Sequence, residues 1–204
     1  TCLAFAASDT HAATRGALTP LSCEYAFFHA QQRGGRSPHE GASWNDMLSA
    51  IEENGQPAEE QWAYLPAIPV DLSQWVPPND IGELFGRRNM PVAATVGMIR
   101  NSLNCGSPVL IVAMLSNSFF SPSASGVVEA QADERPDPNL IHALIAVGHG
   151  KVNGQPALLI RNSWGAAWGI DGHAWLTDMY LKPSLVAAAC LTEECDVSCH
   201  TTAT

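Results

Sequence analysis

The sequence predicts an α+β fold in which helices come first and antiparallel strands follow. Three stretches before residue 55 carry helical signals, whereas the apolar runs after residue 90 are mostly short and bounded by glycines, as strands are. With 204 residues, of which 46% are apolar, the chain can bury a core in one domain or in two closely packed lobes. We therefore expect a globular protein.

Each of the three predicted helices has a recognisable end. The first runs from about Cys2 to Arg15, is rich in alanine and stops at Gly16. The second begins at Ser22, whose hydroxyl can cap it, and is stopped by two glycines at 34 and 35. The third ends at an Asn-Gly pair and has apolar residues at the spacing of one helix face: Trp44, Met47, Leu48 and Ile51.

The rest of the chain reads as a proline-rich connection followed by strands. Residues 55–90 contain many turn signals, and we expect them to cross between lobes. Strands are predicted over 92–96, 109–115, 142–150, 157–162 and 173–181, with a helical stretch ending at Cys105 and a long polar loop over 116–139. The Val152-Asn153-Gly154 turn predicts a hairpin that places His142 and Asn162 on neighbouring antiparallel strands.

Composition excludes several classes of partner. The formal net charge is −10 and the only lysines are Lys151 and Lys182, so no basic patch is available for a nucleic acid. No apolar run approaches 18 residues, and no signal peptide is recognisable in the sequence, so we expect a soluble protein without a membrane partner and leave its location open.

Six cysteines stand at positions 2, 23, 105, 190, 195 and 199. The C-terminal group Cys190, Cys195, Cys199 and His200 offers ligands that zinc selects, but its spacing lacks the usual C-x2-C pair. We favour one disulfide or free thiols there, and we predict neither a metal nor another cofactor.

Three sequence motifs point to a known family. Asn162-Ser163-Trp164-Gly165, followed by Trp168-Gly169 and Gly172, resembles the asparagine motif of the papain-like cysteine peptidase family, and His142-Ala143 with Val147-Gly148 and Gly150 resembles its histidine motif. The stretch from Cys2 to Ala6 resembles the start of its nucleophile helix. His142 follows Cys2 by 140 residues, within the roughly 130 to 150 residues typical of the family.

The resemblance covers about residues 1–182 and implies a papain-like two-lobed fold. It implies one peptidase domain over 1–204, with a helical lobe over about 1–75, an antiparallel β lobe over about 76–182 and a cysteine-containing tail over 183–204. The active site is expected in the cleft between the two lobes.

The resemblance also implies a role for each catalytic residue. Cys2 would attack a peptide carbonyl as a thiolate, which the positive end of its helix favours, and would form a thioester. His142 would act as general acid and base, and the Asn162 side chain would orient its ring. Trp164 would pack over the contact between them and keep water away.

The same resemblance implies four substrate-binding residues: Gly41, Ile141, Ala143 and Trp164. Gly41 corresponds to a glycine whose backbone pairs with extended substrate, although Glu40 stands where the family has a second glycine. Ile141 and Ala143 resemble residues that line a side-chain pocket, so we expect a preference for apolar or small residues. The implied partners are a peptide or protein substrate and a propeptide or other inhibitory segment outside the sequence.

Two departures leave alternatives open. The family has a glutamine six residues before the cysteine that helps to stabilise the oxyanion, whereas only Thr1 precedes Cys2 here. Loss of one such donor typically lowers the rate by about 10² to 10³, so the donor comes from upstream residues or another segment, or the protein is a weak or inactive scaffold that acts as a binding module or effector. Leu3 replaces a usual tryptophan and indicates a distant branch of the family.

Other chemistry is compatible with some of these residues. The same triad could transfer an acyl group to an amine or cleave an isopeptide bond. Thr1 could act as an N-terminal nucleophile with its own amine as base, but the cysteine, histidine and asparagine motifs would then have no explanation.

Overall fold

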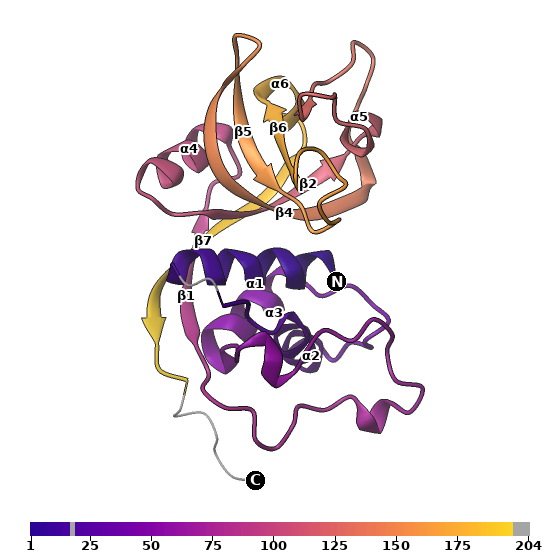
Figure 1. The fold of residues 1–204 in the computed structure, drawn as a ribbon, viewed down its shortest axis with the longest axis vertical. Helices are drawn as coiled ribbons and strands as arrows, with labels where there is room; N and C mark the ends of the chain where they lie inside the picture. Colours follow the sequence, from indigo (N-terminus) through magenta and orange to yellow (C-terminus); the bar gives the residue numbers. More distant parts are fainter. Residues whose placement is uncertain (17–18, 198–204) are drawn as a thin grey trace. The chain divides into compact units, whose positions relative to one another are not determined.

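The computed structural model describes residues 1–16 and 19–197, which group by their contacts into two units. Unit 1 consists of Thr1, Leu3–Asn89 and the described part of Leu191–Thr204, and unit 2 consists of Cys2 and Met90–Cys190. Cys2 is thus grouped apart from the rest of its helix. Figure 1 shows that unit 1 holds the three N-terminal helices and that unit 2 holds most of the sheet.

The helices of unit 1 begin and end where their local signals predict. Helix α1 (Cys2–Arg15) ends at Gly16, which has a left-handed φ of 64°, and α2 (Cys23–Gly34) is capped by Ser22, whose Oγ accepts a 3.1 Å hydrogen bond from the Tyr25 N–H. Helix α3 (Trp44–Ser49) continues into a π-helical turn, η1 (Ala50–Asn54). All three predicted helices are therefore confirmed.

The segment after η1 packs against the helices of its own unit. It contains two 3₁₀ turns, η2 (Glu59–Gln61) and η3 (Leu72–Gln74), and its buried Trp75 donates a 2.6 Å hydrogen bond from Nε1 to the carboxylate of Glu24. The Phe28 ring meets Trp75 edge to face at 5.1 Å. Because residues 55–89 group with unit 1, the prediction that 55–90 crosses between lobes is wrong for nearly the whole segment.

Among the described residues, seven strands form a sheet in the order β1-β7-β2-β4-β5-β6-β3. Their bounds are β1 (Gly86–Val92), β2 (Val109–Leu115), β3 (Val127–Val128), β4 (Asp137–Val152), β5 (Gln155–Arg161), β6 (His173–Thr177) and β7 (Leu185–Cys195). β4 pairs antiparallel with β2 and β5, whereas β3 pairs parallel with β6. The sheet is therefore mixed, whereas the sequence predicted an antiparallel sheet.

Several strand predictions need correction. The strand expected over 92–96 ends at Val92, and Thr95 instead caps helix α4 (Val96–Asn104) by accepting a hydrogen bond from the Met98 N–H. The strand expected over 173–181 becomes a helix, α6 (Asp178–Leu181), after β6, since the Thr177 hydroxyl caps it.

Two further segments contain more regular structure than the sequence indicated. The loop over 116–139 includes helix α5 (Asn117–Phe120) and strand β3. Residues 185–195, assigned above to a C-terminal tail, form β7. This strand pairs antiparallel with β2, from Val109 opposite Cys190 to Ala113 opposite Leu185. The hydrophobic core of unit 2 consists largely of fully buried aliphatic side chains from the sheet and α4, among them Ile99, Ile111, Leu144, Leu158 and Ile160.

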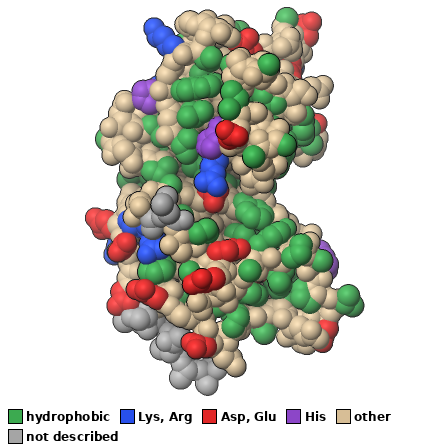
Figure 2. Space-filling view, in the orientation of Figure 1, with side chains coloured by type: hydrophobic (Ala, Val, Ile, Leu, Met, Phe, Trp, Pro, Cys, Tyr) green, Lys and Arg blue, Asp and Glu red, His purple; other side chains and the backbone are tan. Residues whose placement is uncertain are grey.

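The surface carries the acidic charge that the composition predicts. Figure 2 shows acidic side chains spread over the face of unit 1 that is in view. Among the described residues, no helix combines the length and apolar character needed to cross a membrane.

A buried histidine lies inside unit 1. His11 is fully buried, and its Nδ1 lies 2.9 Å from the side-chain oxygen of Gln56, whose nitrogen donates to the Ser8 hydroxyl at 2.6 Å and to the Ser22 carbonyl at 2.9 Å. Burial lowers the pKa of His11 to about 4, even though the hydrogen bond with Gln56 acts in the opposite direction. The folded state therefore holds this imidazole in its neutral form at neutral pH.

This arrangement predicts acid sensitivity. Because the pKa of His11 is about 4 in the folded chain and about 6.5 when unfolded, its stabilising contribution is fully present above pH 6.5 and is lost as the pH falls towards 4. At about 1.4 kcal/mol per pKa unit, the loss is at most about 3 kcal/mol. Urea unfolding of the wild type and of His11→Gln between pH 7 and pH 4 measures it. An equal pH dependence in the two proteins would contradict the assignment.

Candidate active site

The site in unit 2 is built on the β4–β5 hairpin. Val152 pairs with Gln155 across a two-residue turn in which Asn153 and Gly154 both have positive φ, 49° and 77°, as a type I′ turn requires. The predicted hairpin is therefore confirmed. His142 lies in the buried part of β4, and Asn162 directly follows β5.

The side chains of His142 and Asn162 are hydrogen-bonded and nearly fully buried. His142 Nε2 lies 2.8 Å from Asn162 Oδ1, which also accepts a 2.8 Å hydrogen bond from the Ser163 N–H. An amide oxygen only accepts, so this contact requires the proton on Nε2 and leaves Nδ1 as the nitrogen available for a second group. Asn162 thus fixes both the tautomer of His142 and the plane of its ring.

Cys2 belongs to the same unit and interacts with His142. Burial by itself would raise the pKa of the Cys2 thiol, but a hydrogen bond with His142, a second one with the Ala143 backbone and the charge of His142 together lower that pKa to about 7. Cys2 is also the first residue of α1, where the unpaired N–H groups of the helix favour a negative charge. A substantial fraction of this thiol is therefore ionised at neutral pH.

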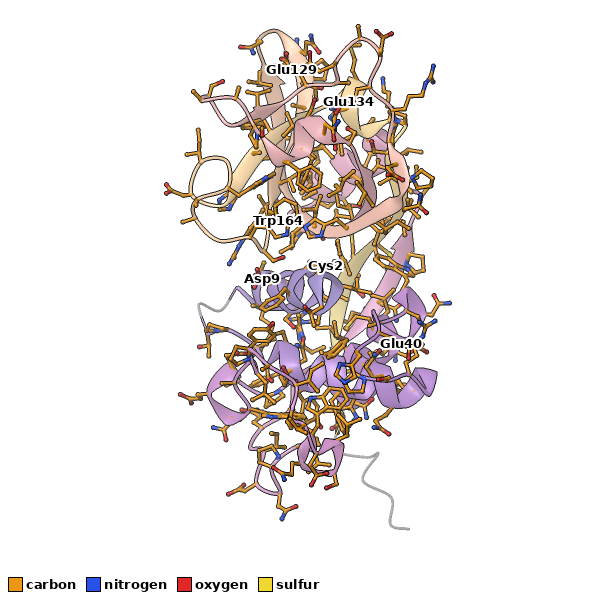
Figure 3. The ribbon with its side chains drawn as sticks, turned by 90° about the vertical axis from the view of Figure 1, so that its right-hand side faces the viewer. Cys2, Asp9, Glu40, Glu129, Glu134 and Trp164 are labelled. Atoms are coloured by element: carbon orange, nitrogen blue, oxygen red, sulfur yellow. The ribbon has the colours of Figure 1, made fainter. Side chains whose placement is uncertain are left out.

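Aromatic side chains cover the histidine. The Trp164 ring lies 4.9 Å from the His142 ring, and the Phe119 ring meets His142 edge to face at 5.9 Å. Phe120 stacks on Trp164 at 5.5 Å with an interplanar angle of 22°. Trp164 itself is 41% exposed, so part of its ring surface remains accessible. Figure 3 labels Trp164 and Cys2.

The loop after Asn162 holds Trp164 through a tight turn. Trp168 anchors this loop, because its Nε1 donates a 3.0 Å hydrogen bond to the Phe119 carbonyl. Gly169 has a φ of 63°, and a Cβ atom there would lie 2.2 Å from the His173 carbonyl oxygen. Only glycine fits this position, which explains the Trp-Gly pair in the motif.

Sequence analysis missed the two phenylalanines. Phe119 and Phe120 lie in what reads as a polar loop, and their roles depend on the short helix α5, which has no periodic signal. The only available signal was an adjacent aromatic pair inside an otherwise polar segment.

The predicted substrate-binding residues differ in accessibility. Ile141 is 56% exposed on β4, whereas Ala143 is buried and contributes little side-chain surface. Gly41 belongs to unit 1, where it is exposed and its carbonyl lies 3.5 Å from the guanidinium of Arg36. Glu40, labelled in Figure 3, uses its carboxylate to accept a hydrogen bond from the Ser37 N–H.

The C-terminal cysteines are only partly described. Cys190 is buried in the core of unit 2 as a free thiol, and Cys195, also free, donates to the Glu52 carbonyl at 3.2 Å. Cys199 and His200 lie outside the described residues. Within residues 1–16 and 19–197, no three histidine, cysteine or acidic side chains gather as they would around a metal ion.

Comparison with known proteins identifies the family of this chain. The family model described as papain family cysteine protease matches residues 84–194, more than half of the chain, a range that includes His142 and Asn162 but not Cys2. A cysteine protease of Blomia tropicalis is 30% identical over 107 residues, which make up 51% of this chain and 32% of that protein. The chain thus spans about a third of the length of this curated relative.

Solved structures agree on the fold. Xylellain, a cysteine protease from Xylella fastidiosa, is 18% identical with a TM-score of 0.72, over 94% of this chain and 78% of xylellain. Digestive procathepsin L 3 of Tenebrio molitor is 20% identical with a TM-score of 0.67, over 94% of this chain and 63% of that one. The fold is papain-like, as predicted, and the chain belongs to the papain family of cysteine proteases.

Proposed function

We propose that this protein is a cysteine peptidase that hydrolyses peptide bonds through a thioester on Cys2. The observation that carries the proposal is the arrangement of three side chains: Cys2 hydrogen-bonds to His142, whose ring is held by Asn162. The contact with His142 also helps to lower the pKa of Cys2 to about 7. A thiolate that is available at neutral pH beside an oriented imidazole is the arrangement that nucleophilic catalysis by cysteine needs.

The reaction then follows from these three side chains. The Cys2 thiolate attacks the carbonyl carbon of the substrate, and His142, holding the proton of the thiol, gives it to the leaving amine as the C–N bond breaks. A water molecule next attacks the thioester, with His142 accepting its proton. The C–S bond breaks, the acid product leaves and Cys2 is regenerated.

Asn162 and Trp164 act on His142 and not on the substrate bond. A neutral amide orients the imidazole without adding a charge that would hold the proton too tightly. Trp164 and Phe119 limit the access of water to the hydrogen bond between His142 and Asn162, which strengthens it. Asn162 is therefore a positioning residue.

Substrate recognition belongs to the same proposal. Ile141 offers an exposed apolar side chain next to His142, which supports a preference for apolar or small side chains in the peptide, and Gly41 is assigned to pairing with the peptide backbone. One similar structure is that of a proenzyme, procathepsin L 3. By analogy, we assign inhibition of the peptidase to a propeptide outside the sequence.

Labelling with the inactivator E-64 tests the nucleophile. We expect one adduct on Cys2, located by peptide mapping, and its loss in the His142→Ala variant because the thiolate is then no longer favoured. Cys2→Ala should also abolish peptide turnover. Cys105→Ala removes an exposed free thiol and serves as the matched control, with labelling and turnover unchanged. Turnover that survives in Cys2→Ala would refute the proposal.

Asn162→Ala tests the positioning role. Loss of the acceptor for His142 Nε2 leaves the ring free to rotate, and misplacement of a catalytic group by about 1 Å can cost on the order of 10² in rate. We expect kcat to fall by about that factor with little change in KM. Asn162→Gln should not restore the rate, because its longer side chain displaces the oxygen. An unchanged kcat in Asn162→Ala would exclude a positioning role.

The pH dependence of thiol alkylation tests the charge state of Cys2. Because the thiolate is the reacting form, the rate with iodoacetamide should rise about tenfold per pH unit below pH 7 and level off above it. In His142→Ala the midpoint should move upwards, since burial, which raises the pKa of the thiol, is then opposed only by the Ala143 backbone hydrogen bond and the N-terminal charge. Mass spectrometry of the Cys2 peptide gives the rate, and a midpoint above pH 8 in the wild type would disprove the ionised form.

A further inference from the structure

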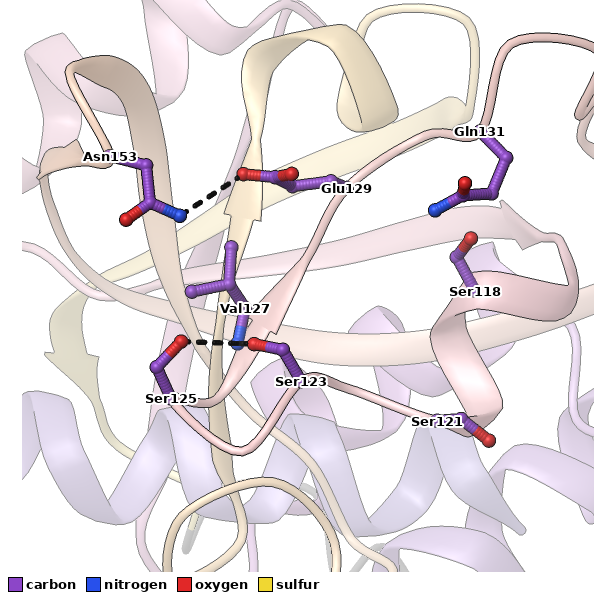
Figure 4. Close-up of a pocket in the computed structure, with 8 residues that line it drawn as sticks. All are labelled: Ser118, Ser121, Ser123, Ser125, Val127, Glu129, Gln131 and Asn153. Atoms are coloured by element: carbon purple, nitrogen blue, oxygen red, sulfur yellow. Dashed lines mark hydrogen bonds between the residues drawn. The ribbon is translucent and has the colours of Figure 1, made fainter.

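A polar cavity of about 260 Å³ opens in unit 2 beside the loop that carries Phe119 and Phe120. Its lining is shown in Figure 4 and consists of Ser118, Ser121, Ser123, Ser125, Val127, Glu129, Gln131 and Asn153. Seven of these eight side chains are polar and none is basic. The volume is below the roughly 300 to 1,000 Å³ of sites for drug-sized ligands, so it fits a single side-chain head group.

The hydroxyl of Ser118 is already used as a donor. Its O–H donates a short hydrogen bond to Glu134, whose carboxylate also accepts from the Ser118 N–H at 2.6 Å and from the Gln131 N–H at 3.1 Å. The lone pairs of this hydroxyl therefore remain for the cavity. Figure 3 shows Glu129 and Glu134 at the same end of unit 2.

The other polar groups that line the cavity also offer mainly hydrogen-bond acceptors to a ligand. Asn153 points its side-chain nitrogen at Glu129 Oε1 at 3.4 Å, which leaves the amide oxygen of Asn153 and the second oxygen of Glu129 for a ligand. Ser123 and Ser125 share a hydrogen bond of 3.0 Å, so one of their two protons is committed within the pair. The cavity is therefore richer in free acceptors than in free donors.

The charges favour the same kind of ligand. Burial acts to raise the pKa of Glu134, but the hydrogen bonds from Ser118 and Gln131 outweigh it, so Glu134 is held ionised. Glu129 adds a carboxylate inside the cavity. The carboxylate of Glu129 in the lining, with the ionised Glu134 bonded to two lining residues and no basic residue in the lining, attracts a cation. A guanidinium or ammonium group supplies donors without acceptors.

We propose that this cavity binds the guanidinium or ammonium head of an arginine or lysine side chain carried by a peptide. Ser118 and Ser121 flank the phenylalanines that contact His142 and Trp164, so the cavity shares its wall with the aromatic cover of the candidate active site. The proposal that a peptide carries the cationic side chain rests on the proposed function, whereas the proposal that the cavity recognises a cation does not.

Binding can be measured without turnover in the full chain carrying Cys2→Ala. The probe is Nα-acetyl-arginine methylamide, and its citrulline analogue, which has nearly the same shape without the charge, is the control ligand. We expect the arginine probe to shift the NMR signals of backbone amides over residues 121–131 and to bind at least tenfold more tightly than the citrulline analogue. A short peptide with one arginine should compete with the probe.

Paired variants locate the effect. Glu129→Gln removes the carboxylate with little change of shape and should weaken binding of the probe at least tenfold, whereas Glu60→Gln removes an exposed charge from unit 1 and should change it less than twofold. Equal binding of the arginine and citrulline probes, or equal loss in the two variants, would overturn the cation site. If free arginine competes with the probe but the peptide does not, the proposal that a peptide supplies the cationic side chain is wrong.

Discussion

The register of the β4–β5 hairpin is the constraint on which the hydrogen bond between His142 and Asn162 depends. The ladder between β4 and β5 pairs Ile145 with Arg161, and a shift of register lies between Ala146 and Gly148. Asn162 has left this ladder, since its N–H donates to the Gly172 carbonyl at 2.9 Å. Its side chain is thereby free to reach along β4 to His142. A one-residue slip of the hairpin would turn His142 to the opposite face and break the contact.

The covering aromatic residues make this part of the sheet suitable for a buried polar pair. Two buried polar side chains are costly unless they bond to each other, and water that competes for the same atoms weakens the bond. Trp164 and Phe119 restrict that competition by covering the His142 ring. Trp168, in the loop that carries Trp164, donates a hydrogen bond to the Phe119 carbonyl and so holds the two covering segments together. Packing and polar geometry therefore depend on the same few side chains.

Local signals in the sequence were sufficient for the elements that carry the hairpin. Capping residues such as Ser22 and terminal glycines such as Gly16 identify helices from their immediate neighbours, and the Asn153-Gly154 turn specifies the register that brings His142 and Asn162 together. These features act over a few residues, which is why they can be read without a structure.

The remaining features depend on partners far away in the chain. Residues 185–195 form a strand because they pair with β2, and the apolar run from Leu185 to Leu191 does not by itself distinguish a strand from a helix. Strand β6 ends at Thr177 because the hydroxyl of this residue caps helix α6, whereas the apolar residues on both sides of Thr177 predicted one continuous strand. Phe119 covers His142 only through the fold of α5, and the polar cavity is assembled from a loop and the β4–β5 turn.

A comparison of His142 with the buried His11 and the half-buried His29 explains why His142 is the histidine proposed for proton transfer. His11 bonds to Gln56 through Nδ1 and His29 packs against Tyr25, and in each the Nε2 atom has no hydrogen-bond partner among the described residues. Burial lowers the pKa of both rings to about 4, so they stay neutral and have no group with which to exchange a proton. His142 differs because Asn162 holds one of its nitrogens while the ring also interacts with a thiol of lowered pKa. The distinction lies in the partners of the ring and not in its burial.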